Sequence, residues 1–169
     1  MNPSQQQLSP SPLTIERYEF VRIDLTASEK SDAHTELAVN VRRQWGAADG
    51  DPRNWRMKLS VRFGGEKGGK ESIYLGEIQI IGYFRVHEKY PEEKTQKLIE
   101  VTAASILYGA CREMLANLTA RGPHGMVSLP SISFIPLPLE TLENSSARIA
   151  EKAPSYGAKK PSGKKRLKK

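Results

Sequence analysis

AASILYGACREMLANLTARG, at residues 103–122, is the stretch that decides the fold, because its apolar residues recur at helical spacing. They form two neighbouring stripes, which are Ile99, Ala103, Ile106, Ala110 and Met114 in one and Leu107, Cys111, Leu115 and Leu118 in the other. A surface helix packed on a single core needs only one apolar stripe. The second stripe therefore predicts that another subunit or a ligand covers part of this helix.

The helix extends upstream of the quoted stretch and has clear signals at both ends. Acidic residues follow Pro91, which suits a helix N-terminus, and Arg121-Gly122 followed by Pro123 is a C-terminal stop. The sequence thus predicts one long helix over residues 92–122. A proline-rich loop follows, SLPSISFIPLPL at residues 128–139, and then a shorter helix from Leu139 to Lys152.

Four strand-like segments precede the helix, over residues 13–26, 36–45, 55–63 and 72–86. The third alternates apolar and polar residues strictly, which predicts one face toward the core and one toward solvent. The fourth is apolar on both sides, which predicts a central strand or one that faces a neighbouring subunit. The first is expected to present Tyr18 and Phe20 on one face and, on the other, Leu13, Ile15, Val21, Ile23 and Leu25.

The connections between these strands are too short for a helical crossover, so the strands are expected to be antiparallel. The predicted fold is α+β: a four-stranded antiparallel sheet followed by a long helix, a proline-rich loop and a shorter helix. The polar residues 1–12 are expected to be disordered. Residues 13–152 are expected to form the folded domain, and residues 153–169 a disordered basic tail.

The net charge of +7 lies at one end of the chain. The segment from Glu143 onward has nine lysine and arginine residues against two glutamates, so residues 1–142 are neutral. A basic tail on a neutral body argues against a nucleic-acid-binding role for the body. The single cysteine, Cys111, and the lack of a signal-peptide pattern or a membrane-spanning apolar run predict a protein of the cytoplasm.

The sequence has no convincing pattern of catalytic or metal-ligating residues. His34, His87 and His124 lack cysteine, histidine or carboxylate neighbours at ligand spacing. Cys111 lies on an apolar stripe, where a buried structural cysteine is more common than a catalytic thiol. Glu77 has no second carboxylate with which to share acid–base chemistry. We therefore expect no enzymatic activity and no metal or cofactor.

Two glycine-containing segments have some features of ligand-binding loops. GGEKGGK at residues 64–70 leads into a strand rather than a helix, so it predicts a hairpin tip and not a phosphate-binding loop. GAADGDPRN at residues 46–54 contains Asp49 and Asp51 but lacks the later ligands and terminal glutamate of a calcium loop. It predicts a plain turn.

Three motifs follow one another along the chain: YLGEIQIIGYF at residues 74–84, the helical stretch quoted above, and VSLPSISF at residues 127–134. The first contains a Leu-Gly-Glu step and a glycine before two aromatics. The helix has an Ile-Leu-Tyr core, an Arg-Glu pair and a final Arg-Gly. In this order the motifs resemble the SecB family of cytoplasmic chaperones, and the likeness covers about residues 13–140.

The resemblance implies an ATP-independent chaperone, a holdase, that binds unfolded polypeptides or preproteins for protein export. It implies a four-stranded sheet with two helices and a homotetramer made from two dimers. By correspondence, an apolar groove for client polypeptides is expected to be lined by Val39, Val41, Tyr74, Ile106 and Phe134.

The resemblance also implies a contact surface for the translocation ATPase SecA, formed by Arg22, Thr26, Leu75 and Glu77. The family has acidic residues at the first two of these positions. Here an arginine and a threonine reverse or remove that charge, so SecA binding is expected to be weak.

Two alternatives stay open at this point. One is a SecB-like chaperone dedicated to a single partner, such as an antitoxin. The other is a nucleic-acid-associated adaptor that acts through the basic tail, since such tails bind phosphate backbones. The tail has one aromatic residue, Tyr156, so specific recognition of bases is not expected.

Overall fold

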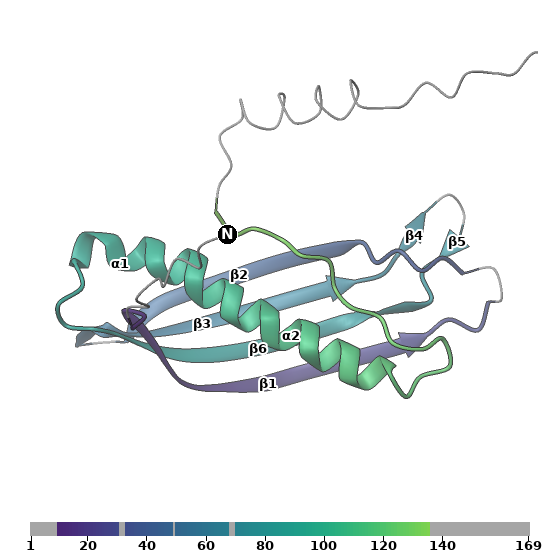
Figure 1. Ribbon diagram of the computed structural model, residues 1–169, viewed down its shortest axis with the longest axis horizontal. Helices are drawn as coiled ribbons and strands as arrows, with labels where there is room; N and C mark the ends of the chain where they lie inside the picture. The colour runs from purple at the N-terminus through teal and green to yellow at the C-terminus, as the bar shows by residue number, and fades with distance from the viewer. Residues whose placement is uncertain (1–9, 31–32, 49, 68–69, 136–169) are drawn as a thin grey trace, which may run out of the picture. The chain divides into compact units, whose positions relative to one another are not determined.

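Four long strands form one antiparallel sheet in the computed structural model, which describes residues 10–30, 33–48, 50–67 and 70–135. The strands are β1 (Leu13–Ala27), β2 (Val39–Ala48), β3 (Asp51–Phe63) and β6 (Tyr74–Val86). Their order across the sheet is β1-β6-β3-β2, and each neighbouring pair is antiparallel (Figure 1). The predicted four-stranded antiparallel sheet is therefore confirmed.

A small hairpin lies in the glycine-rich segment between β3 and β6. It consists of β4 (Glu66–Lys67) and β5 (Lys70–Glu71). Gly64 begins this connection with a φ of 84°, and a Cβ atom there would lie 2.4 Å from the Tyr74 carbonyl oxygen. Glycine is required here because a side chain would collide with the backbone of β6.

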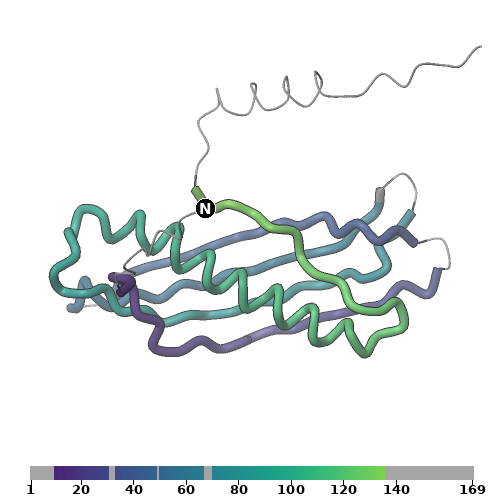
Figure 2. The backbone as a smooth tube through the Cα atoms, in the orientation of Figure 1, coloured from purple at the N-terminus to yellow at the C-terminus, as the bar shows by residue number. Residues whose placement is uncertain are grey.

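A helical segment crosses one face of the sheet, as Figures 1 and 2 show. It consists of α1 (Glu92–Leu98), a π-helical turn η1 (Ile99–Ala103) and α2 (Ala104–Thr119). The predicted long helix is thus present, ending at Thr119 instead of Gly122, but the sequence pattern did not reveal the π-helical turn. Beyond α2, residues 127–135, which we call the strap, run back beside α2 over the same face (Figure 1).

The core lies between the sheet and α2. Alternate residues of β3 supply one wall, and Met57, Leu59, Val61 and Phe63 are all at most 3% exposed. The residues between them lie on the opposite, outer face, as the strict alternation predicts. β6 is one of the two central strands, which agrees with its two-sided apolar pattern, with Ile80 toward the helix and Ile81 buried on the outer face.

The expected faces of β1 are wrong, because two irregularities change the alternation. The register with β6 shifts between Ile15 and Arg17 and again between Phe20 and Arg22. Phe20 therefore pairs with Ile80 and Ile23 pairs with Ile78, whose side chains belong to the core face. A bulge inserts one residue and so moves the following side chains to the other face. Tyr18 and Phe20 consequently share a face with Ile23.

The predicted folded domain begins at residue 13, within the described residues, and ends at residue 152, outside them. At the N-terminal end, the His87 N–H donates to the Pro12 carbonyl at 2.8 Å, so ordered contacts begin just before Leu13. The predicted shorter helix at residues 139–152 and the predicted disorder of residues 1–9 and 153–169 lie outside the described residues.

Candidate functional site

The strap is fastened to α2 by three side chains of the helix. The Tyr108 hydroxyl donates to the Pro130 carbonyl at 2.7 Å, and Arg112 Nε donates to the Leu129 carbonyl at 3.0 Å. The Val127 N–H donates to Thr119 Oγ1 at 3.0 Å. These bonds satisfy backbone groups that have no strand or helix partner. The chain itself therefore covers one flank of the broad apolar helix.

Phe134 lies near the end of the strap and is half-buried. Its ring meets the Tyr108 ring edge to face, with centroids 5.9 Å apart. The Arg43 guanidinium lies 5.5 Å from the Phe134 ring centroid and 5.6 Å from that of Trp45. Arg43 thus joins the strap to β2, and both rings keep part of their surface open to solvent.

β2 presents its apolar side next to the strap. Val39, Val41 and Trp45 alternate along this edge strand, are half-buried, and pack against the core together with Phe134. We call these four residues the strap surface. Among the described strands, none pairs with the free edge of β2. The arrangement combines partly open apolar side chains with an unpaired strand edge.

The structure brings three of the five predicted groove residues together in the strap surface: Val39, Val41 and Phe134. Ile106 is 38% exposed on α2, on a side from which no bond to the strap is made. On the neighbouring part of the sheet, β1 leaves Tyr18 49% exposed and Ile23 40% exposed on its helix-facing side. Ile106 is therefore not part of the strap surface, and we call Tyr18, Ile23 and Ile106, three exposed apolar residues on the helix side of the sheet, the second apolar surface.

Tyr74 is placed differently from the prediction. Its side chain is 1% exposed, its hydroxyl accepts a bond from the His124 N–H at 3.2 Å, and the two rings meet 5.5 Å apart. A Cβ atom on Gly122 would lie 2.2 Å from the Tyr74 hydroxyl oxygen. Tyr74 thus holds the turn after α2 in place through its contacts with Gly122 and His124, and it does not line an open surface in this structure.

The four residues of the predicted SecA contact surface lie together on the outer face of the sheet. Thr26 pairs with Leu75 across β1 and β6, and the Arg22 guanidinium lies 3.8 Å from the Glu77 carboxylate. Glu77 is also 3.6 Å from Arg62, and its side chain is 12% exposed. Two arginines therefore neutralise the one acidic residue of this surface.

The thiol of Cys111 on α2 is a poor nucleophile near neutral pH. Burial raises the pKa of the Cys111 thiol to about 12, and burial also raises the pKa of the Tyr108 hydroxyl. A thiol with such a pKa stays protonated near neutral pH, so it is a poor nucleophile. Within the described part of the chain, no group of three or more His, Cys, Asp or Glu side chains could hold a metal ion.

Two members of the site were not predicted from the sequence. Trp45 ends the second strand-like segment, residues 36–45, and the sequence does not indicate that it belongs to a binding surface. Arg43 occupies an apolar-parity position between Val41 and Trp45, and this break in the alternation was the available signal. Its NH1 donates to the Glu100 carbonyl at 2.6 Å, which orients the guanidinium between the two rings.

Among the described helices, none is long and apolar enough to span a membrane.

Comparison with known proteins places the chain in a family. A family model described as preprotein translocase subunit SecB matches residues 19–144. Protein-export proteins SecB from two strains of Acidithiobacillus ferrooxidans are each 34% identical over 68 residues, which is 40% of this chain and 45% of the relative. The match thus spans about half the length of these relatives.

A solved structure shares the fold. It is a SecB-like chaperone from Mycobacterium tuberculosis in complex with a peptide from an antitoxin, with a TM-score of 0.55 and 14% sequence identity. The superposition covers 72% of this chain and 88% of that one. The strands, the helix and the family model, which matches well over half of the sequence, agree: the chain belongs to the preprotein translocase subunit SecB family.

Proposed function

We propose that this protein is an ATP-independent holdase that binds unfolded polypeptides at the strap surface. The observation that supports the proposal is the partly open apolar patch formed by Val39, Val41, Trp45 and Phe134. Burial of apolar area is non-directional, so such a surface accepts many sequences. Because the binding needs no chemical step, it needs no nucleotide.

The free edge of β2 supports the same proposal. An extended client segment can pair with the backbone of an unpaired strand, and these hydrogen bonds do not depend on the client's side chains. Val39 and Val41 lie on that edge strand, so a client that pairs with β2 would also contact the strap surface. Backbone pairing would supply affinity, and the apolar side chains would select against very polar segments.

The second apolar surface is proposed to be covered by another copy of the chain. Tyr18, Ile23 and Ile106 are 49%, 40% and 38% exposed on the helix side of the sheet, and apolar side chains of this kind are commonly buried between subunits. A homotetramer built from two dimers, as the family resemblance implies, would bury this area. Light scattering coupled to size-exclusion chromatography measures the oligomeric state, and a monomer at micromolar concentration would contradict this part of the proposal.

We propose that the protein binds SecA weakly, so that delivery of clients to SecA is not its main role. A basic partner needs an acidic surface, and Arg22 and Arg62 neutralise Glu77. A chaperone dedicated to one client is therefore the second candidate. The Mycobacterium tuberculosis neighbour, which binds a peptide from an antitoxin, supports that candidate at the level of the fold.

The test is suppression of aggregation of a chemically denatured protein without ATP. We expect the full-length chain to protect, and Phe134→Asp to protect far less, because a carboxylate desolvated in the apolar patch is costly. Ser131→Asp places the same charge on an exposed position of the same strap and is expected to leave protection unchanged. Circular dichroism confirms that both variants are folded.

Three outcomes would change the proposal. Equal protection by the two variants would move the client site away from the strap surface. No protection by a well-folded wild-type chain would favour the single dedicated client. Loss of protection on replacing Lys164 and Lys165 of the tail by glutamine would favour a role for the tail, and the nucleic-acid-associated adaptor would then be tested next.

A further inference from the structure

We propose that the outer face of the sheet binds an extended acidic segment of a partner polypeptide. This face is opposite to α2 and the strap, so the proposal does not depend on the holdase function. It rests on four cationic residues that we call the cationic ladder: Arg42, Arg56, Lys58 and Arg62.

The ladder follows from the pairing of β2 with β3. On the outer face, four cross-strand pairs succeed one another: Asn40 with Arg62, Arg42 with Ser60, Gln44 with Lys58, and Gly46 with Arg56. Each of the four pairs therefore contains one cationic residue. Residues two apart along a strand are about 6.6 Å apart, so the cations form a row with that repeat.

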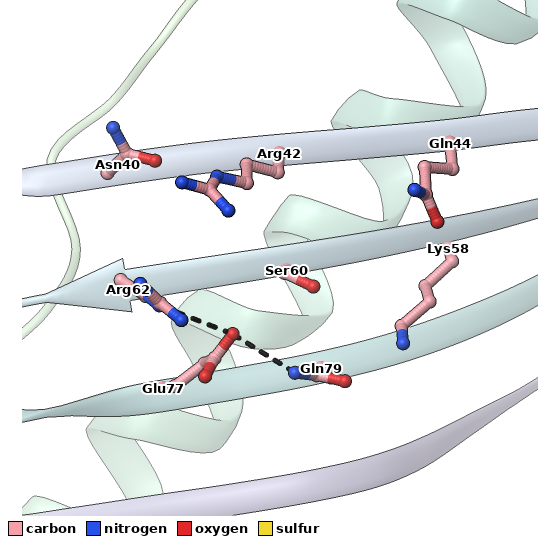
Figure 3. Close-up of a pocket in the computed structure, with 8 residues that line it drawn as sticks. All are labelled: Asn40, Arg42, Gln44, Lys58, Ser60, Arg62, Glu77 and Gln79. Atoms are coloured by element: carbon pink, nitrogen blue, oxygen red, sulfur yellow. Dashed lines mark hydrogen bonds and ion pairs between the residues drawn. The ribbon is translucent and has the colours of Figure 1, made fainter.

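A hollow lies over this row. It has a volume of about 220 Å³ and is lined by residues of β2, β3 and β6: Asn40, Arg42, Gln44, Lys58, Ser60, Arg62, Glu77 and Gln79 (Figure 3). A second hollow shares Gln44 and Lys58 with it and continues to Arg56. The first is small for a metabolite, for which pockets of about 300–1,000 Å³ are usual, and the second, with a volume of about 310 Å³, lies at the lower end of that range. Together they form a shallow run that suits the side chains of an extended chain.

Two cations at the centre of the row have no anionic partner in the described structure. Arg62 and Gln79 bind Glu77, and the dashed lines of Figure 3 show this pair of contacts. Among the described residues, no carboxylate oxygen lies within 4.0 Å of a side-chain nitrogen of Arg42 or Lys58. An incoming carboxylate can therefore bind both without displacing an existing ion pair.

The spacing favours an extended acidic peptide as the partner. In an extended chain, every second side chain points the same way, with the same repeat of about 6.6 Å as the ladder. A segment with an acidic residue at every second position would place successive carboxylates near Arg62, Arg42, Lys58 and Arg56, in the order of the cross-strand pairs. Asn40, Gln44 and Gln79 offer amide groups for the backbone of that segment.

A nucleic acid is less well matched. Single strands bind to proteins by stacking bases on aromatic rings as well as by phosphate contacts. The hollow over Arg42 and Lys58 has no aromatic residue in its lining, and Glu77 lies at one end of it. Trp45 borders the second hollow, but it shares the helix-facing side of β2 with Val39 and Val41. The basic tail carries the same sign of charge as the ladder, so it is not the occupant.

The test measures binding of a fluorescent peptide of about twelve residues that alternates glutamate and serine, sized to cover the ladder. Its anisotropy is titrated with the full-length protein at about 50 mM salt, where charge interactions are weakly screened. The Arg42→Gln/Lys58→Gln variant is expected to bind about tenfold more weakly, as the loss of two ion pairs predicts. Arg56→Gln alone is expected to lose about threefold.

Matched controls remove the same charge elsewhere. Lys94→Gln/Lys97→Gln changes two exposed residues of α1, and Lys164→Gln/Lys165→Gln changes two residues of the tail. We expect both to bind the acidic peptide within about twofold of the wild type, since α1 lies on the opposite face of the sheet from the ladder and the tail residues are not part of the ladder. A peptide with glutamine in place of glutamate is expected not to bind.

Two results would overturn the proposal. Equal losses in the three double variants would show that the peptide responds to net charge and not to the ladder. The second result uses a deoxythymidylate oligomer of the same length as the probe. If Arg42→Gln/Lys58→Gln weakened binding of that oligomer but not of the peptide, the outer face would be a nucleic-acid surface.

Discussion

Leu107 of α2 packs directly on Gly82 of β6, and the missing side chain of the glycine makes this contact possible. A Cβ atom on Gly82 would lie 2.8 Å from Leu107 Cδ2 and 2.6 Å from Cε2 of Phe84. Real Cβ atoms do not approach other carbons so closely. Gly82 therefore sets how near α2 lies to the sheet, and with it the position of the strap that α2 supports.

Gly82→Ala is expected to lower the free energy of unfolding by about 1–3 kcal/mol, because the added methyl group overpacks the interface between α2 and β6. Urea denaturation measures the change. Gly109→Ala is the control: its Cβ would meet nothing within 4 Å, and alanine in a helix is expected to stabilise by about 0.5–1 kcal/mol. If both variants stabilised the protein equally, the close approach at Gly82 would be wrong.

Cys111 is expected to make stability depend on alkaline pH. Burial raises its pKa from 9.0 to about 12, so above pH 9.0 the unfolded chain loses a proton that the folded chain keeps. The contribution of the thiol is complete below about pH 9 and is lost as the pH rises toward about 12. Urea unfolding between these pH values is expected to show a shallower decline for Cys111→Ala than for the wild type.

The same burial predicts slow alkylation of Cys111 by iodoacetamide in the native protein. Since the side chain is fully buried, the reaction requires opening of the structure. Addition of denaturant is expected to make the thiol react at the rate of a free cysteine. A native rate equal to the denatured rate would show that α2 is not packed as described.

Tyr108→Phe is expected to loosen the strap while leaving α2 in place. The substitution removes the hydroxyl that donates to the Pro130 carbonyl, at a cost of about 1 kcal/mol. Hydrogen exchange of the backbone amides of residues 131–135 should become faster. Tyr18→Phe removes a hydroxyl from an exposed ring and serves as the control. Equal exchange in both variants would mean that Arg112 and Thr119 suffice to hold the strap.

Arg22→Glu is expected to create an acidic cluster on the outer face with Asp24 and Glu77. Arg22 forms ion pairs with both residues, and its replacement leaves Arg62 as the one remaining ion-pair partner of Glu77 among the described residues. Binding of SecA, measured by titration calorimetry, should become stronger, because a basic partner is attracted to the exposed carboxylates. Arg17→Glu on the same strand is the charge-matched control. No gain from Arg22→Glu over Arg17→Glu would argue against a SecA-binding role for this position.

The sequence predicted the elements that follow a regular period. The strict alternation of β3 and the two-sided apolar pattern of β6 led to the correct face and the correct place in the sheet. Alternation did not predict the faces of β1, because bulges near Arg17 and Arg22 place Tyr18 and Phe20 on the same face as Ile23. Neither bulge carries a glycine or proline that would have indicated it.

The site was less predictable than the fold. Val39, Val41 and Phe134 lie in the strap surface, and their contact with client polypeptides stays a prediction, whereas Tyr74 is buried under the turn at His124. No local pattern distinguishes a tyrosine that lines a surface from one whose hydroxyl supports a distant turn. Contacts between segments far apart in the sequence decide that difference.

The π-helical turn helps to explain how one row of side chains stays buried along the whole helical segment, which the 3.6-residue period of an α-helix alone does not explain. A row of buried positions recurs at every fourth residue from one end to the other, with Ala104 and Tyr108 buried beside it: Thr95, Ile99, Ala103, Leu107, Cys111, Leu115 and Thr119. In a pure α-helix of 3.6 residues per turn, such a row would wind gradually away from the sheet. The wider turn of η1 contains one extra residue, and this residue offsets part of the rotation of the row around the helix axis. Deleting Thr102 would therefore rotate α1 by about 100° about its axis, expose Thr95, and separate Glu92 from Arg53, although every residue of the sheet would be unchanged.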